Sequence, residues 1–188
     1  MKPIFFMLPM ALCSMALAAD LRPAPETIES EGTKAIHATA KTLKSTLMAT
    51  MKSEGAITAI STCNIVAPNL AQEQINGWKV SRTSQKIRNP DNAADAYEKH
   101  LLEEMKHQLE NGAKPDELTI SDMRHGQYVV AKPIMIAKPC LACHGSNIDK
   151  PVAEKLQSLY PNDHATGYST GDFRGIFIAR KPMKIEHR

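Results

Sequence analysis

The chain carries two cysteines separated by two residues and followed directly by a histidine: Cys140, Cys143 and His144. Cys-x-x-Cys-His is the attachment pattern of a c-type haem. Two intervening residues place the sulfur atoms about one helical turn apart, roughly the span between the two vinyl-bearing edges of the ring, and the next residue then points at the iron. The pattern predicts that Cys140 and Cys143 bind one haem covalently as thioethers and that His144 is an axial ligand.

A redox dithiol and half of a zinc site are two other interpretations of the same motif. A thioredoxin-type pair is expected near a parallel βαβ pattern, and a zinc site needs two further soft ligands at short spacing. The next cysteine, Cys63, lies far upstream. Haem attachment is therefore the favoured interpretation.

The first 19 residues are typical of a secretory signal peptide. Lys2 precedes an apolar run over residues 4–17, and Ala16-Leu17-Ala18 matches a signal-peptidase site. The run is shorter than the roughly 20 residues that a membrane-spanning helix needs, so an uncleaved anchor is the weaker alternative. Lipidation at Cys13 is disfavoured because bulky Leu12 precedes it. We expect cleavage near Ala18 or Ala19 and a bacterial periplasmic or secreted domain over residues 20–188.

Cys63 is left without a partner after export, because three of the four cysteines remain and haem would use two of them. An intermolecular disulfide, a free thiol, an inert buried thiol and a metal ligand stay open. In a helix, Cys63 shares a face with Ala56, Ala59 and Ala67. Such small residues let a flat macrocycle approach a thiolate ligand, although helix–helix packing also favours them. The unpaired thiol favours Cys63 as the second axial ligand.

Composition limits the remaining possibilities. About 170 residues after processing suit one domain with a buried core. The formal charge of +3 falls to +2 when Lys2 is removed, and no basic block indicates a nucleic-acid surface. No later membrane span is predicted, so we expect a free soluble protein after signal cleavage.

Hydrophobic periodicity predicts helices first and strands later. Residues 30–52 form an amphipathic helix, Gly55 breaks it, and a second helical stretch ends near Pro68. Asp91 or Asn92 is expected to cap a third helix that ends at 111–112, and a short helix covers 151–159. Strands are expected at 77–83, 118–122, 127–136, where Pro133 interrupts, and 175–180. This order predicts an α+β fold with an antiparallel sheet.

Further candidate haem contacts are basic and aromatic side chains. Haem propionates are anions that need partners where they are partly buried, which makes Arg82, Lys86 and Arg88 candidates for charge-assisted hydrogen bonds. A solvated basic edge explains each of them equally well. Tyr160 and Tyr168, in a loop rich in Gly, Asp and Tyr, are also candidate cofactor contacts.

Four motifs occur together in order: residues 59–63, Arg82-Thr83-Ser84 with residues 88–92, residues 140–144, and Tyr160-Pro161 through Gly175. The set resembles the c-type-haem, PAS-like sensor domains found in bacterial periplasmic receptors and in small secreted haem proteins, over nearly the whole mature chain. The resemblance implies an antiparallel PAS-like sheet flanked by a long N-terminal helical segment, with haem between them. It also implies His/Cys axial ligation, here by His144 and Cys63. Many relatives continue into transmembrane and signalling modules, whereas this chain stops at Arg188, so receptor function is not inherited directly.

The expected function is redox sensing or one-electron transfer by a haem that cycles between Fe(III) and Fe(II). A thiolate ligand should place its potential below that of His/Met cytochromes. Reduction weakens the iron–thiolate bond, so we hypothesise that Cys63 can leave and admit CO, NO or a replacement ligand. Met123, His125 and Met135 are candidate replacements, each also explained as structural or exposed. The alternatives are a haem enzyme or gas-binding protein, and a module that passes its state to a redox or signalling partner.

Overall fold

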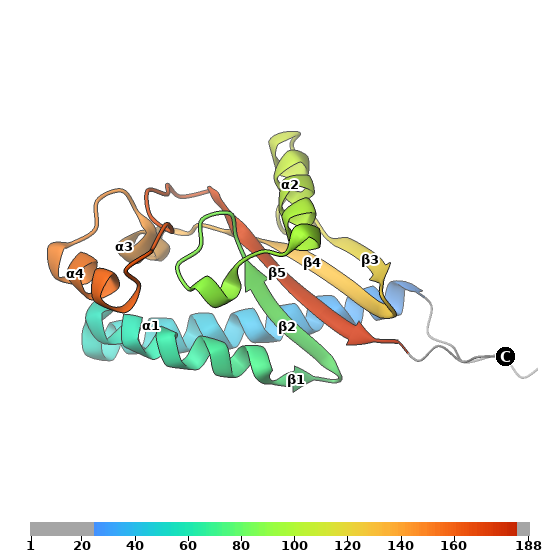
Figure 1. Cartoon of the computed structure of the whole chain (residues 1–188), viewed down its shortest axis with the longest axis horizontal. Helices are drawn as coiled ribbons and strands as arrows, with labels where there is room; N and C mark the ends of the chain where they lie inside the picture. The colour runs from blue at the N-terminus through green and yellow to red at the C-terminus, as the bar shows by residue number, and fades with distance from the viewer. Residues whose placement is uncertain (1–24, 184–188) are drawn as a thin grey trace, which may run out of the picture.

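A computed structural model describes residues 25–183 of the chain (Figure 1). The predicted signal peptide and Cys13 lie outside these residues. The elements follow in the order α1 (Pro25–Gln72), β1 (Gln74–Ile75), β2 (Trp78–Thr83), the 3-10 turn η1 (Pro90–Asn92), α2 (Ala96–Glu110), β3 (Ile120–Arg124), β4 (Gln127–Met135), the 3-10 turn η2 (Lys138–Cys140), α3 (Leu141–His144), α4 (Lys150–Leu159) and β5 (Phe173–Pro182).

The five strands form one sheet in the order β1-β2-β5-β4-β3, and every neighbouring pair is antiparallel. Helix α1 lies along one face of this sheet and α2 crosses the other (Figure 1). The predicted α+β class is confirmed, with an antiparallel sheet flanked by a long N-terminal helical segment and further helices. Among the described residues, no helix combines the length and apolar character that crossing a membrane requires.

Helix α1 consists of two arms separated at Gly55, as the sequence predicted. Gly55 has φ 84° and ψ 173°, a conformation that residues with a Cβ rarely adopt. The chain reverses there, and the second arm returns towards β1 (Figure 1). The first arm buries Ile36 in a cluster that includes Trp78 and Val130 of the sheet. Packing against the sheet therefore fixes the first arm and places the bend beyond the sheet edge.

Helix α2 begins at a different cap from the one predicted. Asp91 and Asn92 belong to the 3-10 turn η1, and Asp95 is the N-cap of α2. The Asp95 carboxylate accepts a hydrogen bond from the Glu98 N–H at 2.7 Å, and the Glu98 carboxylate accepts one from the Asp95 N–H at 3.1 Å. This reciprocal capping box satisfies two backbone donors, which a cap at Asp91 or Asn92 would leave without these partners.

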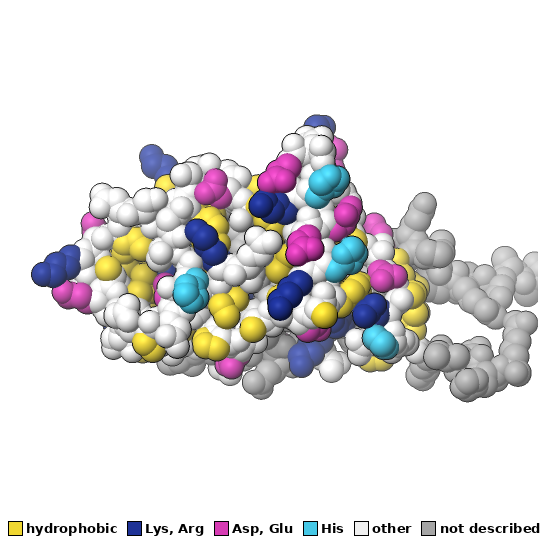
Figure 2. Space-filling view, turned by 45° about the horizontal axis from the view of Figure 1, so that its top comes forward, with side chains coloured by type: hydrophobic (Ala, Val, Ile, Leu, Met, Phe, Trp, Pro, Cys, Tyr) yellow, Lys and Arg dark blue, Asp and Glu magenta, His cyan; other side chains and the backbone are white. Residues whose placement is uncertain are grey.

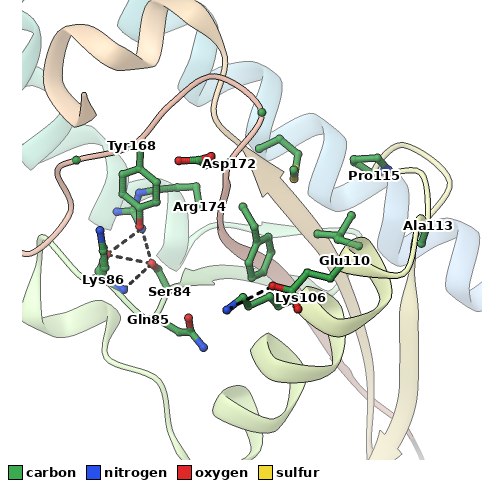
Figure 3. Close-up of a pocket in the computed structure, with 15 residues that line it drawn as sticks. Ser84, Gln85, Lys86, Lys106, Glu110, Ala113, Pro115, Tyr168, Asp172 and Arg174 are labelled. Atoms are coloured by element: carbon green, nitrogen blue, oxygen red, sulfur yellow. Dashed lines mark hydrogen bonds and ion pairs between the residues drawn. The ribbon is translucent and has the colours of Figure 1, made fainter. Parts of the chain in front are cut away.

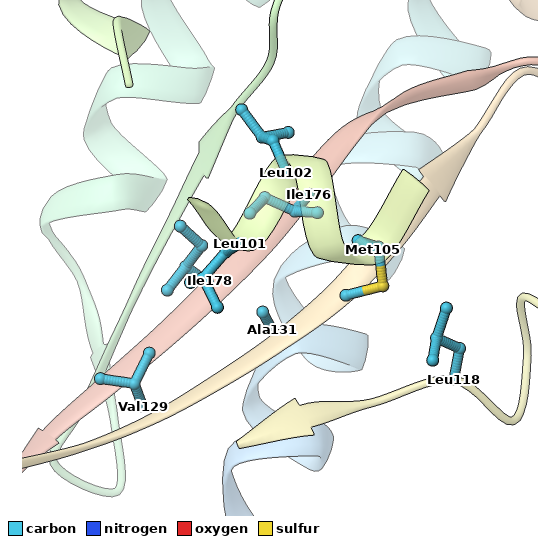
Figure 4. Packing of buried hydrophobic residues seen from close by; sticks show 8 residues of the cluster. All are labelled: Leu101, Leu102, Met105, Leu118, Val129, Ala131, Ile176 and Ile178. Carbon is cyan, nitrogen blue, oxygen red and sulfur yellow. The ribbon is translucent and has the colours of Figure 1, made fainter. Parts of the chain in front are cut away.

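An apolar ridge of α2, which contains Tyr97, Leu101, Met105 and Leu109, packs on the central strands. Leu101, Leu102 and Met105 are buried against β4 and β5 in one cluster (Figure 4). The ridge residues Tyr97 and Leu109 are partly buried beside it. Burying side chains of this size contributes about 1.5–3 kcal/mol each, so α2 is held mainly by this contact.

The predicted interruption of the third strand at Pro133 is wrong. Strand β4 continues to Met135 and stays paired with β5, with Pro133 opposite Ile176 and an irregularity only at Ile134/Met135. Its pairing with β3 ends at Ala131, so at Pro133 the strand β4 has no partner on that side, and proline is tolerated at such an edge. The two-residue strand β1 was not predicted because such a short segment carries no periodic signal.

Candidate functional site

A cleft of about 240 Å³ lies where β2 and β4 end and β5 begins, between this edge of the sheet and α1. Much of its wall is apolar, with side chains from α1 on one side and from the sheet and its loops on the other: Leu47, Met51, Ile60, Ile87, Ile136 and Phe177. Of the nine candidate haem ligands and haem contacts named from the sequence, seven line the cleft: Cys63, Arg82, Arg88, Cys140, Cys143, His144 and Tyr160. The structure therefore brings together residues that lie up to 97 positions apart in the chain.

The Cys-x-x-Cys-His motif forms a compact helical turn at one wall of the cleft. It spans η2 and the four-residue α3, and Gly145, with extended backbone, ends it. Residues three apart on a helical turn share a face, so Cys140 and Cys143 are directed to the same side. Both are half-buried. Burial raises the pKa of the Cys143 thiol, while the nearby Arg88 charge lowers it.

His144 is held in one orientation by a backbone carbonyl. Its Nδ1 lies 2.6 Å from the Ala165 oxygen, and because a carbonyl only accepts, Nδ1 carries the proton and Nε2 keeps a free lone pair. Burial, followed by the Arg88 charge, lowers the pKa of His144 to about 3. The imidazole is therefore neutral at pH 7, which is the state that ligates a metal. The Tyr168 ring packs edge-on against the imidazole, with 6.3 Å between the two ring centres.

Cys63 lies on the second arm of α1 and is half-buried beside the buried residues Ala59 and Ile60. The side chain of Ala67, predicted to share this face, lies outside the described residues. Burial raises the pKa of the Cys63 thiol, and the charges of Arg82 and Arg88 act in the opposite direction. Cys63, Cys140 and Cys143 are all free of disulfide bonds.

The polar part of the cleft is dominated by arginines. Arg88 donates from Nε to Asp163 at 2.9 Å and from Nη2 to the Cys143 oxygen at 2.5 Å, so it ties the haem motif to the loop after α4. Among the side chains that the structure describes, no carboxylate pairs with Arg82 or Arg174, and burial lowers the pKa of both. Two uncompensated guanidinium groups in one cleft favour an anionic ligand group.

Sequence reasoning missed Arg174 and Asp163. Arg174 reaches the cleft because β5 pairs with β2 in a register that sets Ile176 opposite Thr83. Gly175 permits this close pairing, since an added Cβ would lie 2.2 Å from the Thr83 oxygen. Neither register nor close approach has a local sequence signal.

Lys86 and Tyr168 line an adjoining hollow of about 550 Å³ rather than the cleft (Figure 3). The Lys86 ammonium lies 4.9 Å from the centre of the Tyr168 ring and donates to the Thr166 oxygen at 3.2 Å. Arg174 lines both spaces and donates to Ser84 and to the Lys86 carbonyl. Tyr168 therefore lies outside the cleft and contacts its lining through the ring of His144.

The candidate replacement ligands are separated by the fold. Met123 and His125 are exposed on β3 and on the β3–β4 turn, whereas Met135 lines the cleft. His100 and His107 on α2 are exposed. Within the described part of the chain, no three His, Cys, Asp or Glu side chains gather as a direct metal site.

Comparison with known proteins places the chain in a family. The model of the Tll0287-like family matches residues 24–182. Among solved structures, the cyanobacterial heme-protein Tll0287 has a similar fold: the TM-score is 0.57 at 20% identity, over 88% of this chain and 100% of that chain. No curated protein matches the sequence. Since the family model covers nearly the whole chain, this protein belongs to the Tll0287-like family.

Proposed function

We propose that this protein binds one haem c through Cys140 and Cys143, that His144 and Cys63 would ligate its iron, and that the protein serves in redox sensing or one-electron transfer. The observation that carries the proposal is the convergence of Cys63 with the Cys-x-x-Cys-His motif in a single cleft. The description of the solved relative as a heme-protein supports haem binding in this family.

The residues of the cleft suit this group. Two thiols on one helical turn match covalent attachment, and an imidazole with a free Nε2 supplies one ligand. Cys63 from α1 supplies a thiol at the same cleft. The apolar walls suit a porphyrin ring, and Arg82 offers an unpaired cation to a propionate.

When bound, haem supplies a reversible one-electron couple, which thiolate ligation places below that of His/Met cytochromes. The protein orients the ligands: the Ala165 carbonyl fixes the His144 ring, and Arg88 holds the Cys143 carbonyl. The apolar side chains of Leu47 and Phe177 line the cleft and would shield the bound group from water.

We further propose a periplasmic or secreted location, supported by the predicted signal peptide and by the need of haem c for exported cysteines. The physiological partner would be a redox or signalling protein. Figure 2 shows acidic and basic side chains interspersed on one face of the molecule, which suits a protein partner better than a nucleic acid.

Intact mass tests covalent attachment. The processed protein, expressed with a c-type cytochrome maturation system, should carry the added mass of one haem. Cys140→Ala and Cys143→Ala should abolish or weaken attachment, whereas the control Cys63→Ser should keep the added mass. A wild-type mass without haem would contradict the proposal.

A further inference from the structure

The segment after α4, residues 160–166, touches both sides of the cleft. At its start, the Tyr160 hydroxyl donates to Oδ1 of Asn64 at 2.9 Å, and Asn64 directly follows Cys63 on α1. Near its end, the Ala165 oxygen holds Nδ1 of His144 at 2.6 Å. One short segment thus contacts the neighbour of one proposed ligand and the other ligand itself.

Hydrogen bonds within this segment, and from it to Ile87 and Arg88, brace it. The Asp163 carboxylate accepts from Arg88 at 2.9 Å and from the Ala165 N–H at 2.7 Å. The Asp163 N–H donates to the backbone carbonyl of Tyr160 at 3.0 Å, and the His164 N–H donates to the backbone carbonyl of Ile87 at 3.0 Å. Because its two ends are fixed relative to each other, a shift at Tyr160 is not absorbed inside the segment.

Tyr160 is itself held by packing. Its half-buried ring lies against the cluster of Ile60, Val152 and Leu156, which joins α1 to α4. Burial raises the pKa of the Tyr160 phenol, so the hydroxyl keeps its proton at neutral pH and donates to Asn64. Because the ring of Tyr160 is held by packing, its hydroxyl can fix the position of the helical turn of α1 that carries Cys63.

We propose that Tyr160 is a positioning residue for Cys63: its hydrogen bond to Asn64 ties α1 to the segment that orients His144, and so resists displacement of Cys63 by another ligand. The inference rests on the proposed His144 and Cys63 ligation. The ease with which another ligand replaces Cys63 then depends on residues 160–166 as well as on the thiol itself.

Imidazole displacement tests this role. The ferric holoprotein and its Tyr160→Phe variant are titrated with imidazole and followed by absorption. Loss of one hydrogen bond should lower the half-saturating imidazole concentration about two- to tenfold. Asn64→Ala should give a similar shift, and the double variant should add little, because both changes remove the same bond. The control Tyr97→Phe removes a hydroxyl that bonds Asp122 on the α2 side and should leave the titration unchanged.

The outcomes separate positioning from stability. A Tyr160→Phe protein with a lower urea midpoint but an unchanged imidazole titration would overturn the proposal, as would fully additive effects of Tyr160→Phe and Asn64→Ala. Failure of the underlying ligation is visible independently: Cys63→Ser would then leave the spectrum and the imidazole titration of the parent unchanged.

Discussion

Replacing Asp163 with alanine removes the centre of the contact between the haem motif and the segment after α4. The carboxylate pairs with Arg88 at 2.9 Å and accepts from the Ala165 N–H at 2.7 Å. The side chains of Arg88 and Asp163 are only 14% and 9% exposed. The substitution therefore leaves a largely buried guanidinium beside the charges of Arg82 and Arg174.

The expected loss follows from this geometry. Removing one partner of a buried ion pair costs about 3–5 kcal/mol. Arg88 keeps its bond to the Cys143 oxygen and a longer one, of 3.4 Å, to the Ala165 oxygen. We therefore expect the lower end, about 3 kcal/mol, including the lost bond of Ala165 N–H. For a domain of this size, that lowers the melting temperature by about 6–12 °C.

Urea unfolding at pH 7, followed by circular dichroism, measures this loss. The matched control is Glu154→Ala, which removes an exposed pair with Lys150 at 3.9 Å, where the side chains are 67% and 87% exposed. The control should change the free energy of unfolding by less than about 0.5 kcal/mol. An Asp163→Ala protein as stable as the control would refute the view that this ion pair secures the cleft.

In the haem-free protein, acidification from about pH 6.5 towards pH 3 should destabilise the fold, because the unfolded imidazole of His144 binds a proton in this range while the folded one, with a pKa of about 3, stays neutral. The free energy of unfolding should fall by about 1 kcal/mol per pH unit, and His144→Gln should flatten the dependence of the urea midpoint on pH. Gly175→Ala places a Cβ 2.2 Å from the Thr83 oxygen and should cost about 1–3 kcal/mol in urea unfolding; a wild-type midpoint would contradict the close pairing of β2 and β5. Lys132→Met should lower the free energy of unfolding by about 2 kcal/mol, because the buried ammonium donates to three acceptors in residues 116–119. An unchanged thermal melt would show that water satisfies these acceptors in place of the ammonium.

Features with a local physical cause could be predicted from the sequence. The break at Gly55 follows from the freedom of glycine, and the ridge of α2 follows from helical periodicity. Several polar residues precede α2, and Asp95 is the one that caps the helix because it pairs reciprocally with Glu98. An Asp followed by Glu three residues later was the available signal.

Features that depend on tertiary structure could not be predicted in this way. The Cys-x-x-Cys-His motif is local, and counting exported thiols indicated Cys63, but only the fold brings them to one cleft. Arg174 reaches the cleft through strand register, and Asn64 meets Tyr160 because the second arm of α1 returns along the molecule. Lys86 lies between Arg82 and Arg88 in the sequence, yet its side chain lines the adjoining hollow rather than the cleft.

The central claim, that Cys63 and His144 ligate one covalently bound haem, is tested most directly by absorption and EPR spectra of the purified protein beside Cys63→Ser in both oxidation states. The wild type should show a low-spin ferric spectrum with a thiolate signature, and Cys63→Ser should lose that signature. A wild-type spectrum without it, or a variant with the same spectrum, would contradict the claim.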